Sequence, residues 1–292
     1  MSVDLPLWRS MLFVPATAER LWAKARTRGA DAIIVDLEDA VAASEKARAR
    51  EMLSDVIPVV GQAGADVIVR INRPMRMAVA DLEAAVIPGV AAIMIPKAES
   101  ASHIRLLTEA IAELEAERGV PQLRLIALIE TVEGFGNADE IAAHPRMAGI
   151  TLGGEDFAAA VGMPAVEAAL IRPYLREIVL AARGGGCLAL GYAGSIANFT
   201  DLDAYAQDIA AARAMGFDGG SCIHPAQVPV LNAGFAPGAE EIAHAGRVVE
   251  AYDKALAEGR GAIELDGKMI DVPVADRARA TLARRDRIAA KG

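Results

Sequence analysis

Eight short apolar runs, each followed by a segment of helical character, constrain the fold of this 292-residue chain more than any other feature. They occupy residues 10–16, 32–37, 66–72 and 91–96, two stretches within residues 125–157, and residues 187–193 and 219–223. Strands that alternate with helices are typical of parallel sheets, and eight such units favour a closed (β/α)8 barrel, the TIM barrel, over an open sheet. One helical segment, residues 165–183, is expected to break near Pro173, because proline lacks the N–H that a helix needs.

Polar side chains recur where these runs end. The residues at or just beyond a carboxyl end are Asp36, Glu38, Asp39, Arg70, Asn72, Lys97, Glu130, Glu155, Asp156, Ser195 and His224. In a barrel these ends face one mouth, where active sites are built. Scattered surface charges would not be so regular, so we expect a catalytic mouth. A purely structural barrel is the alternative.

The stretch from residue 125 to residue 157 indicates what this mouth binds. Glu130 follows its first strand, and Glu155 and Asp156 follow its second. Two parallel strands deliver these carboxylates to one crevice, and two carboxylates that leave other positions to water and substrate are a common way to hold Mg²⁺. Mn²⁺ accepts the same octahedral oxygen ligands, so it stays open as a second metal. Alternatively, the acids only cap the helices that follow them.

Arg70 adds a cation to the same mouth. Its planar guanidinium is expected near the oxygens of a metal-chelated 2-oxo acid, which suits making or breaking a carbon–carbon bond beside a carbonyl. Asp36, Glu38 and Asp39 are expected to hold metal-bound waters or to orient Arg70, rather than to bind the metal directly. The alternative is that Arg70 only pairs with Asp36 or Glu38. His224 precedes a proline and is expected to fix a backbone turn rather than to transfer protons.

Charge and cysteine usage limit the classes of partner. The net charge of −9 argues against nucleic acid, and it requires that an anionic ligand be held by a local cluster of Lys and Arg. Cys187 and Cys222 lie in apolar runs without metal-type spacing, so we expect reduced core thiols in a cytoplasmic protein. Neither a signal peptide nor a transmembrane helix is expected, because no apolar run approaches the length of a membrane span.

The C-terminal part of the chain has a pattern of its own. Residues 1–235 are expected to form the catalytic barrel, and residues 236–292 an extension of helix, hairpin and helix. Residues 263–270 read IELDGKMI, two short apolar arms around Asp-Gly, the dipeptide that type I′ hairpin turns prefer. A basic helix over residues 275–289 follows. The extension is expected to act as a lid or oligomer arm, with a merely protective surface hairpin as the alternative.

The ordered motifs of the chain resemble those of a known family. They read RSMLFVPA, DAIIVDLEDAV, VIVRIN, IMIPKAES, LIALIETVEG, ITLGGEDFAA, GFDGGSCIHPAQ and GRGAIELDGKMIDVP. This order resembles the citrate lyase β-subunit-like branch of the HpcH/HpaI aldolase superfamily, which includes malyl-CoA and citramalyl-CoA lyases. The resemblance implies a TIM barrel assembled as a trimer or hexamer. It also implies Mg²⁺-dependent, reversible cleavage of a 3-hydroxyacyl thioester into an acetyl-type thioester and a 2-oxo acid.

The resemblance also assigns roles to single positions. Glu130 and Asp156 match the two metal ligands of the family, with Glu130 beside the substrate, and Arg70 matches its substrate- and enolate-binding arginine. Asp271 matches the acid/base carboxylate that the C-terminal segment brings to the active site of an adjacent subunit. The positions that match contacts to coenzyme A are Phe13, Arg20, Lys24, Lys46 and Arg50. Solvated surface charge is the alternative for the basic residues of this set.

Two departures bear on the activity within this superfamily. The class II pyruvate aldolases carry a D-G-E-H-type run, whereas residues 36–39 read DLED; the missing histidine favours a lyase. Coenzyme A-dependent relatives usually carry an A-I-D-G-type run, whereas residues 189–192 read ALGY. The thioester carrier can therefore be a different acyl-CoA or an acyl carrier protein. A CoA-independent 2-oxo-acid aldolase and a non-catalytic metal-binding barrel also stay open.

Overall fold

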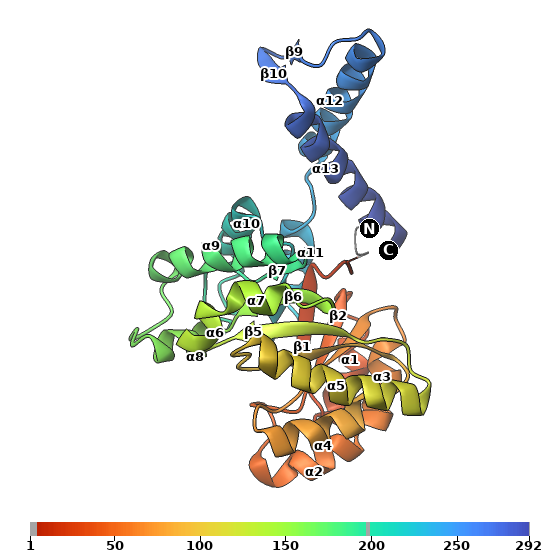
Figure 1. Cartoon of the computed structure of the whole chain (residues 1–292), viewed down its shortest axis with the longest axis vertical. Helices are drawn as coiled ribbons and strands as arrows, with labels where there is room; N and C mark the ends of the chain where they lie inside the picture. Colours follow the sequence, from red (N-terminus) through yellow and green to blue (C-terminus); the bar gives the residue numbers. More distant parts are fainter. Residues whose placement is uncertain (1–4, 197–198, 292) are drawn as a thin grey trace. The chain divides into compact units, whose positions relative to one another are not determined.

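The computed structural model describes residues 5–196 and 199–291 (Figure 1). The chain forms two compact units that divide after Phe235. The larger unit holds a ring of parallel strands with helices around it, and the smaller unit holds two long helices and a hairpin. Within the described ranges, no helix is long and apolar enough to cross a membrane.

Strands and helices alternate along the larger unit. Its strands are β1 (Ser10–Pro15), β2 (Ala32–Asp36), β3 (Asp66–Arg70), β4 (Val90–Ile95), β5 (Arg124–Ile129), β6 (Met147–Leu152), β7 (Leu188–Leu190) and β8 (Gly220–Cys222). Its helices are α1 (Glu19–Ala25), α2 (Lys46–Glu51) with the short 3-10 turn η1 (Ala43–Glu45) before it, α3 (Leu53–Gly61), α4 (Met75–Ala85), α5 (Ala101–Arg118), α6 (Val132–Gly136), α7 (Ala138–Ala142), α8 (Gly154–Ala160), α9 (Ala168–Gly185), α10 (Leu202–Met215) and α11 (Gln227–Gly234).

The strands close into a barrel. Their order is β7-β6-β5-β4-β3-β2-β1-β8, and every neighbouring pair is parallel. A parallel bridge between Leu190 and Gly219 joins the two ends of this row, and the Gly191 N–H donates to the Gly219 carbonyl at 2.8 Å. The predicted (β/α)8 barrel is therefore confirmed.

The pleat of the strands sorts their side chains into two layers. In β2, Ala32 and Ile34 pack in the barrel interior, whereas Ile33 and Val35 pack with the helices. Because side chains alternate between the faces of a strand, Asp36 at the end of β2 follows Ile34 on the inner side. The same alternation carries the inner face of β3 from Ile68 to Arg70, and that of β5 from Ile126 and Leu128 to Glu130. The local pattern of each strand thus aims its terminal polar residue into the mouth.

Helix α9 corrects one expectation. It runs from Ala168 to Gly185 without a break, with Pro173 inside it. Proline near the start of a helix removes one hydrogen bond, and here the packing of the apolar face compensates for the loss: Ile171, Leu175 and Ile178 are all buried. The expected break at Pro173 was therefore wrong.

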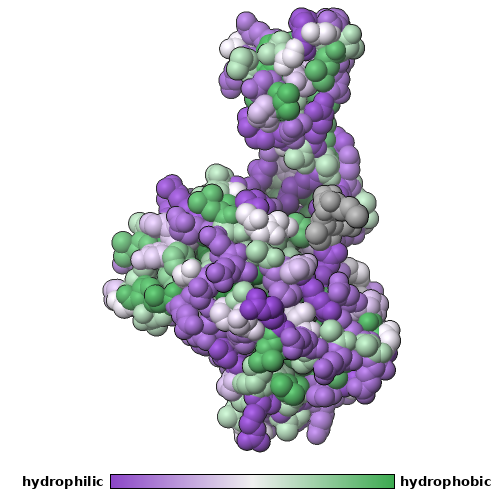
Figure 2. Space-filling view, viewed as in Figure 1, coloured by the Kyte–Doolittle hydropathy of each residue, from purple (hydrophilic) through white to green (hydrophobic). Residues whose placement is uncertain are grey.

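The larger unit buries its apolar side chains efficiently. Trp8, Met11 and Ile34 are among its fully buried residues, and on the face shown in Figure 2 most side chains are hydrophilic with hydrophobic ones in small groups. Cys187 and Cys222 are free and buried, as expected, and burial raises the pKa of their thiols to about 11 and about 12. Unreactive core thiols of this kind serve packing rather than chemistry.

The smaller unit has its own small core. It consists of α12 (Ala239–Ala257), β9 (Ile263–Leu265), β10 (Lys268–Ile270) and α13 (Val272–Lys291). Tyr252 of α12 packs with Ile270 and with Ala275 of α13. Asp266 and Gly267 both have positive φ angles, +52° and +75°, as a type I′ turn requires, so the predicted hairpin is confirmed.

Closure of the barrel gives a testable prediction at Gly219. A Cβ at this position would lie 1.8 Å from the carbonyl oxygen of Trp8, so only glycine allows the strands to approach there. We expect Gly219→Ala to lower the free energy of unfolding by about 3 kcal/mol in urea titrations. Gly184→Ala is the matched control, because nothing lies within 4 Å of its Cβ and α9 gains a better helix former. Equal midpoints for the two variants would contradict this packing.

Candidate active site

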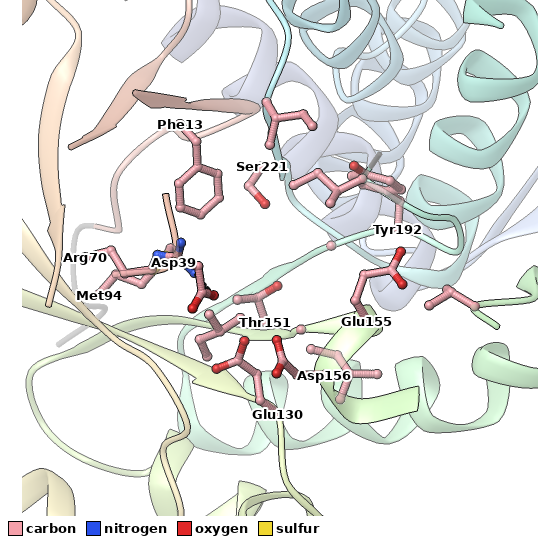
Figure 3. A pocket seen from close by; sticks show the side chains of 18 of the residues that line it. Phe13, Asp39, Arg70, Met94, Glu130, Thr151, Glu155, Asp156, Tyr192 and Ser221 are labelled. Carbon is pink, nitrogen blue, oxygen red and sulfur yellow. Dashed lines mark hydrogen bonds and ion pairs between the residues drawn. The ribbon is translucent and has the colours of Figure 1, made fainter. Parts of the chain in front are cut away.

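A pocket of about 450 Å³ opens at the carboxyl ends of the barrel strands (Figure 3). Each of the eight strands contributes a residue within two positions of its end: Phe13, Asp36, Arg70, Met94, Leu128, Thr151, Gly191 and Ser221. The pocket therefore occupies the mouth of the barrel, where the sequence predicts an active site.

Arg70 is held rigidly by the carboxylate of Asp36. Its Nε donates to Asp36 Oδ1 and its Nη2 to Asp36 Oδ2, both at 2.7 Å, and both residues are buried. The same carboxylate accepts the backbone N–H groups of Glu38 and Ala40 at 2.9 and 3.1 Å. A two-point contact between planar groups fixes orientation as well as distance. Asp36 thus sets the direction in which Arg70 faces the pocket.

Two further acids and an aromatic ring surround the guanidinium of Arg70. Its Nη1 lies 2.8 Å from Glu38 Oε2 and 3.5 Å from Asp39 Oδ2, and its Cζ lies 4.8 Å from the centre of the Phe13 ring. Burial alone would lower the pKa of Arg70, but the hydrogen bonds to Asp36 and the three negative charges raise it. Arg70 is therefore a permanent cation whose charge is already matched within the protein.

Glu130 is a buried carboxylate with few partners. It is 3% exposed, it accepts one hydrogen bond, from the Lys97 backbone N–H at 2.9 Å, and among the described residues it forms no salt bridge. Burial raises its pKa to about 8, against the opposing effect of that hydrogen bond. Thr131, not Glu130, caps α6 by accepting the N–H of Gly134. Glu130 therefore has no structural task as a helix cap.

Asp156 lies beside Glu130. The two carboxylates point into the same part of the pocket, as Figure 3 shows, with Asp156 in the first turn of α8. Gly153, just before α8, makes room for Glu130, because a Cβ there would lie 2.4 Å from Glu130 Cγ. The neighbouring acid, Glu155, instead accepts a hydrogen bond from Ser195. The structure thus distinguishes the two adjacent acids, which the sequence pattern alone cannot.

Glu38 is a second buried glutamate whose pKa is raised, as that of Glu130 is. It is 6% exposed, and burial raises its pKa to about 7 although Arg70 opposes the shift. Lys97 links the two sides of the site, with its Nζ 3.8 Å from Glu38 Oε1 and 3.5 Å from Asp156 Oδ1. The backbone of Lys97 has a φ of +45°, which is unusual for a residue with a side chain. The sequence suggests no partner for Lys97. Its position two residues beyond the end of β4 is the one feature that indicates a place in the mouth.

The residues matched to coenzyme A contacts fall into three groups. Phe13 lines the pocket, and Arg20 and Lys24 are exposed on α1. The Nζ of Lys46 donates to the carbonyls of Leu37 and Glu38 at 2.6 Å each. Arg50 donates from Nε to the buried Asp81 at 2.6 Å, and Asp81 in turn anchors Asn72. Lys46 and Arg50 therefore stabilise the chain around β2 and β3. Contacts between coenzyme A and any of these five residues stay predictions.

His224 and Asp271 each form a local hydrogen bond with the backbone. His224 contributes to a backbone turn, because its Nδ1 accepts the N–H of Ala226 at 3.2 Å, and its ring stacks on Phe199. Asp271 belongs to the smaller unit, where its carboxylate accepts the N–H of Val274 at the start of α13. Its acid/base role stays a prediction. Thr151 and Tyr192 also line the pocket, and the sequence pattern did not single them out.

Glu130 and Asp156 are the residues that best fit a hard cation. Glu130 is buried and forms no salt bridge with any described residue, although the charge of Lys97 acts on it, and Gly153 leaves space at its carboxylate. In the part of the chain that the structure describes, no group of three or more His, Cys, Asp or Glu side chains could hold a metal ion alone. A hard cation between Glu130 and Asp156 would therefore take its other ligands from water and substrate, as Mg²⁺ commonly does.

Comparison with known proteins identifies the family. A family model described as HpcH/HpaI aldolase/citrate lyase matches residues 9–225, which include all eight barrel strands. The chain belongs to the HpcH/HpaI aldolase/citrate lyase family. The resemblance of the ordered motifs is thereby confirmed.

Relatives within the HpcH/HpaI family match the chain over nearly its full length. A (3S)-malyl-CoA thioesterase of Cereibacter sphaeroides is 39% identical over 97% of this chain and 96% of its own. The citrate lyase subunit beta of Escherichia coli is 37% identical over 94% of this chain and 92% of its own. Among solved structures, CitE from Mycobacterium tuberculosis in complex with magnesium, acetoacetate and coenzyme A gives a TM-score of 0.76 at 32% identity. The match covers 97% of this chain and 99% of that one.

The electrostatics of Glu130 give a prediction for stability. Its folded pKa of about 8 exceeds the ordinary value of 4.5, so the folded state binds a proton more tightly than the unfolded state does. The stability from this proton is complete below pH 4.5 and is lost as the pH rises to about 8. In the presence of a chelator, Glu130→Gln should therefore raise the free energy of unfolding by roughly 2 to 4 kcal/mol at about pH 9.

The same comparison near pH 5 should show little difference, because Glu130 is then protonated. Glu133→Gln, at an exposed position of α6, is the control and should change the unfolding energy by less than about 0.5 kcal/mol at both pH values. Urea titrations measure all three proteins. A Glu130→Gln variant that is less stable than the parent at the higher pH would contradict the desolvation of Glu130.

Proposed function

We propose that this protein is a Mg²⁺-dependent lyase that cleaves or forms a carbon–carbon bond in a 3-hydroxyacyl thioester. The products of cleavage are an acetyl-type thioester and a 2-oxo acid. One observation carries the proposal: the paired carboxylates of Glu130 and Asp156 share a pocket with the fixed cation of Arg70. The relatives with a citrate lyase description and the CitE complex with magnesium and coenzyme A support it.

Glu130 and Asp156 would hold the metal ion. When bound there, Mg²⁺ supplies a Lewis acid for the carboxylate and keto oxygens of the oxo acid. Loading of the site would release a proton from Glu130, because burial raises the pKa of its carboxyl to about 8. Mn²⁺ is compatible with the same oxygen ligands.

Arg70 would bind the oxygen of the thioester that gains negative charge when the α-carbon loses its proton. The two-point contact with Asp36 holds the guanidinium in place before the reaction, so little reorganisation is needed when the charge develops. The Phe13 ring covers one side of Arg70 and keeps water from that side. Arg70 thereby stabilises the enolate without exchanging a proton itself.

The thioester carrier and the assembly are further parts of the proposal. Arg20 and Lys24 are exposed cations that could meet the phosphates of coenzyme A, and an acyl carrier protein is the other carrier. The smaller unit is proposed to act as a lid or arm within a homotrimer or homohexamer. The buried reduced thiols fit a protein that works in the cytoplasm.

The first experiment measures binding and turnover together. Titration calorimetry of the metal-free protein with Mg²⁺, and then with acetyl-CoA plus glyoxylate, pyruvate or oxaloacetate, should show binding of the oxo acid and thioester that depends on the metal. Glu130→Ala and Asp156→Ala should each weaken Mg²⁺ binding by at least about 100-fold, because each removes one of two charged ligands. Glu133→Ala, outside the pocket, is the control.

The products separate the proposal from its competitors. A new 3-hydroxyacyl thioester supports the lyase, whereas free coenzyme A without a new carbon–carbon bond supports a thioesterase, the description of one relative. Metal-dependent binding of an oxo acid without any response to acetyl-CoA would favour a CoA-independent aldolase or a carrier-protein substrate. Binding of Mg²⁺ without binding of any oxo acid or thioester would favour a non-catalytic metal-binding barrel.

Asp271 gives a separate prediction. We propose that its carboxylate takes and returns the proton at the α-carbon of the thioester. Asp271→Asn should then lower kcat by about 100-fold to 10,000-fold, while the affinity for Mg²⁺ stays unchanged. Asn retains the acceptor for the Val274 N–H, so the start of α13 should persist. A variant with normal kcat would exclude Asp271 as the acid/base group.

A further inference from the structure

The pocket at the barrel mouth has an apolar lining that the proposed reaction does not use. Five aliphatic residues contribute to it from one stretch of the chain, namely Leu152, Val166, Ile171, Leu175 and Ile196. Ile171 and Leu175 are four residues apart on one face of α9 and are almost completely buried. Val166 lies close to Gly154, the first residue of the helix that carries Asp156. An apolar surface thus adjoins the proposed metal site.

The charged residues of the pocket lining are mostly acidic. Among the described residues that line it, Arg70 is the one cation, whereas five acids line it: Asp36, Asp39, Glu130, Glu155 and Asp156. In the Mg²⁺-loaded protein, the ion would match Glu130 and Asp156. Arg70 is already matched by Asp36, Glu38 and Asp39. The nearby ammonium of Lys97 lies between Glu38 and Asp156.

This distribution bears on the side chain of the 2-oxo acid. The carboxylate next to the keto group is common to all 2-oxo acids and belongs to the metal site. A second carboxylate, as in oxaloacetate, would have to leave water for an apolar surface without a free cation, which is unfavourable. An alkyl group at the same place would be stabilised by burial.

This proposal rests on the proposed function. We propose that the preferred 2-oxo acid carries an uncharged alkyl substituent of two or more carbons, which packs against the half-buried side chains of Val166 and Ile196. In the condensing direction, the thioester α-carbon loses a proton to a carboxylate and bonds to C2 of the oxo acid. The keto oxygen takes up a proton and becomes the 3-hydroxyl. The alkyl group takes no part in these steps, so it affects selectivity and not the chemistry.

Two oxo acids of nearly the same shape test the proposal. 4-Methyl-2-oxopentanoate carries an isobutyl group where oxaloacetate carries a CH₂-carboxylate, so the pair differs mainly in charge. Calorimetric titration of the Mg²⁺-loaded protein should give a Kd for 4-methyl-2-oxopentanoate at least about 10-fold lower than for oxaloacetate. It should also be at least about 10-fold lower than for pyruvate, since each buried methylene contributes about a factor of four.

A charge placed in the apolar lining should reverse this preference. Val166 is half-buried, and Val166→Lys should raise the affinity for oxaloacetate by about 10-fold and weaken binding of 4-methyl-2-oxopentanoate. Leu170→Lys is the control: Leu170 is 49% exposed and does not line the pocket, so this variant adds the same charge nearby without changing either Kd. A cooperative unfolding transition in urea for both variants establishes that each is folded.

The outcomes separate this proposal from the proposed function. Oxaloacetate binding as tightly as 4-methyl-2-oxopentanoate, in a protein that binds pyruvate with Mg²⁺, would overturn the alkyl preference and leave the lyase standing. A Val166→Lys variant with the parent's selectivity would overturn the placement of the alkyl group. Failure of every oxo acid to bind in the presence of Mg²⁺ would overturn the proposed function and the preference with it.

Discussion

The barrel mouth buries more negative charge than positive charge, and this imbalance governs the site. Asp36 is matched by Arg70 and by two backbone N–H groups, whereas Glu130 receives one N–H from Lys97. A carboxylate removed from water is costly unless donors or cations replace the water. Glu130 is therefore the group that gains most from a cation, and the protein without one is less stable than its core would allow. Binding sites are commonly less stable than their scaffolds for this reason.

Much of this arrangement can be predicted from the sequence, because the pleat of a strand places alternate side chains on its inner face. Eight apolar runs predicted the barrel, and alternation within β2, β3 and β5 is enough to aim Asp36, Arg70 and Glu130 at the mouth. The pattern could not choose between Glu155 and Asp156, because both follow β6 and the difference lies in their partners. Ser195, forty residues away in the chain, engages Glu155, and Asp156 is left beside Glu130.

The contacts that the sequence does not reveal depend on backbone conformation and on long-range register. Lys97 reaches Glu38 and Asp156, and its N–H reaches Glu130, because its φ of +45° turns the chain after β4, and no residue pattern signals a lysine in that conformation. The sequence resemblance matches Arg50 to a coenzyme A contact, and nothing in the sequence indicates that it pairs with Asp81, 31 residues away. Pairings of this kind arise only once the strands are in register.

The same apolar lining bears on the choice between carbon–carbon cleavage and hydrolysis. Relatives of nearly equal identity carry thioesterase and citrate lyase descriptions, so overall similarity does not decide between the two reactions. Hydrolysis needs an ordered water at the thioester carbonyl, whereas the lyase needs an enolate that water does not protonate. Val166 and Ile196 offer no hydrogen bond to such a water. An alkyl group packed against them would displace the remaining water, so the feature that selects the oxo acid would also protect the enolate.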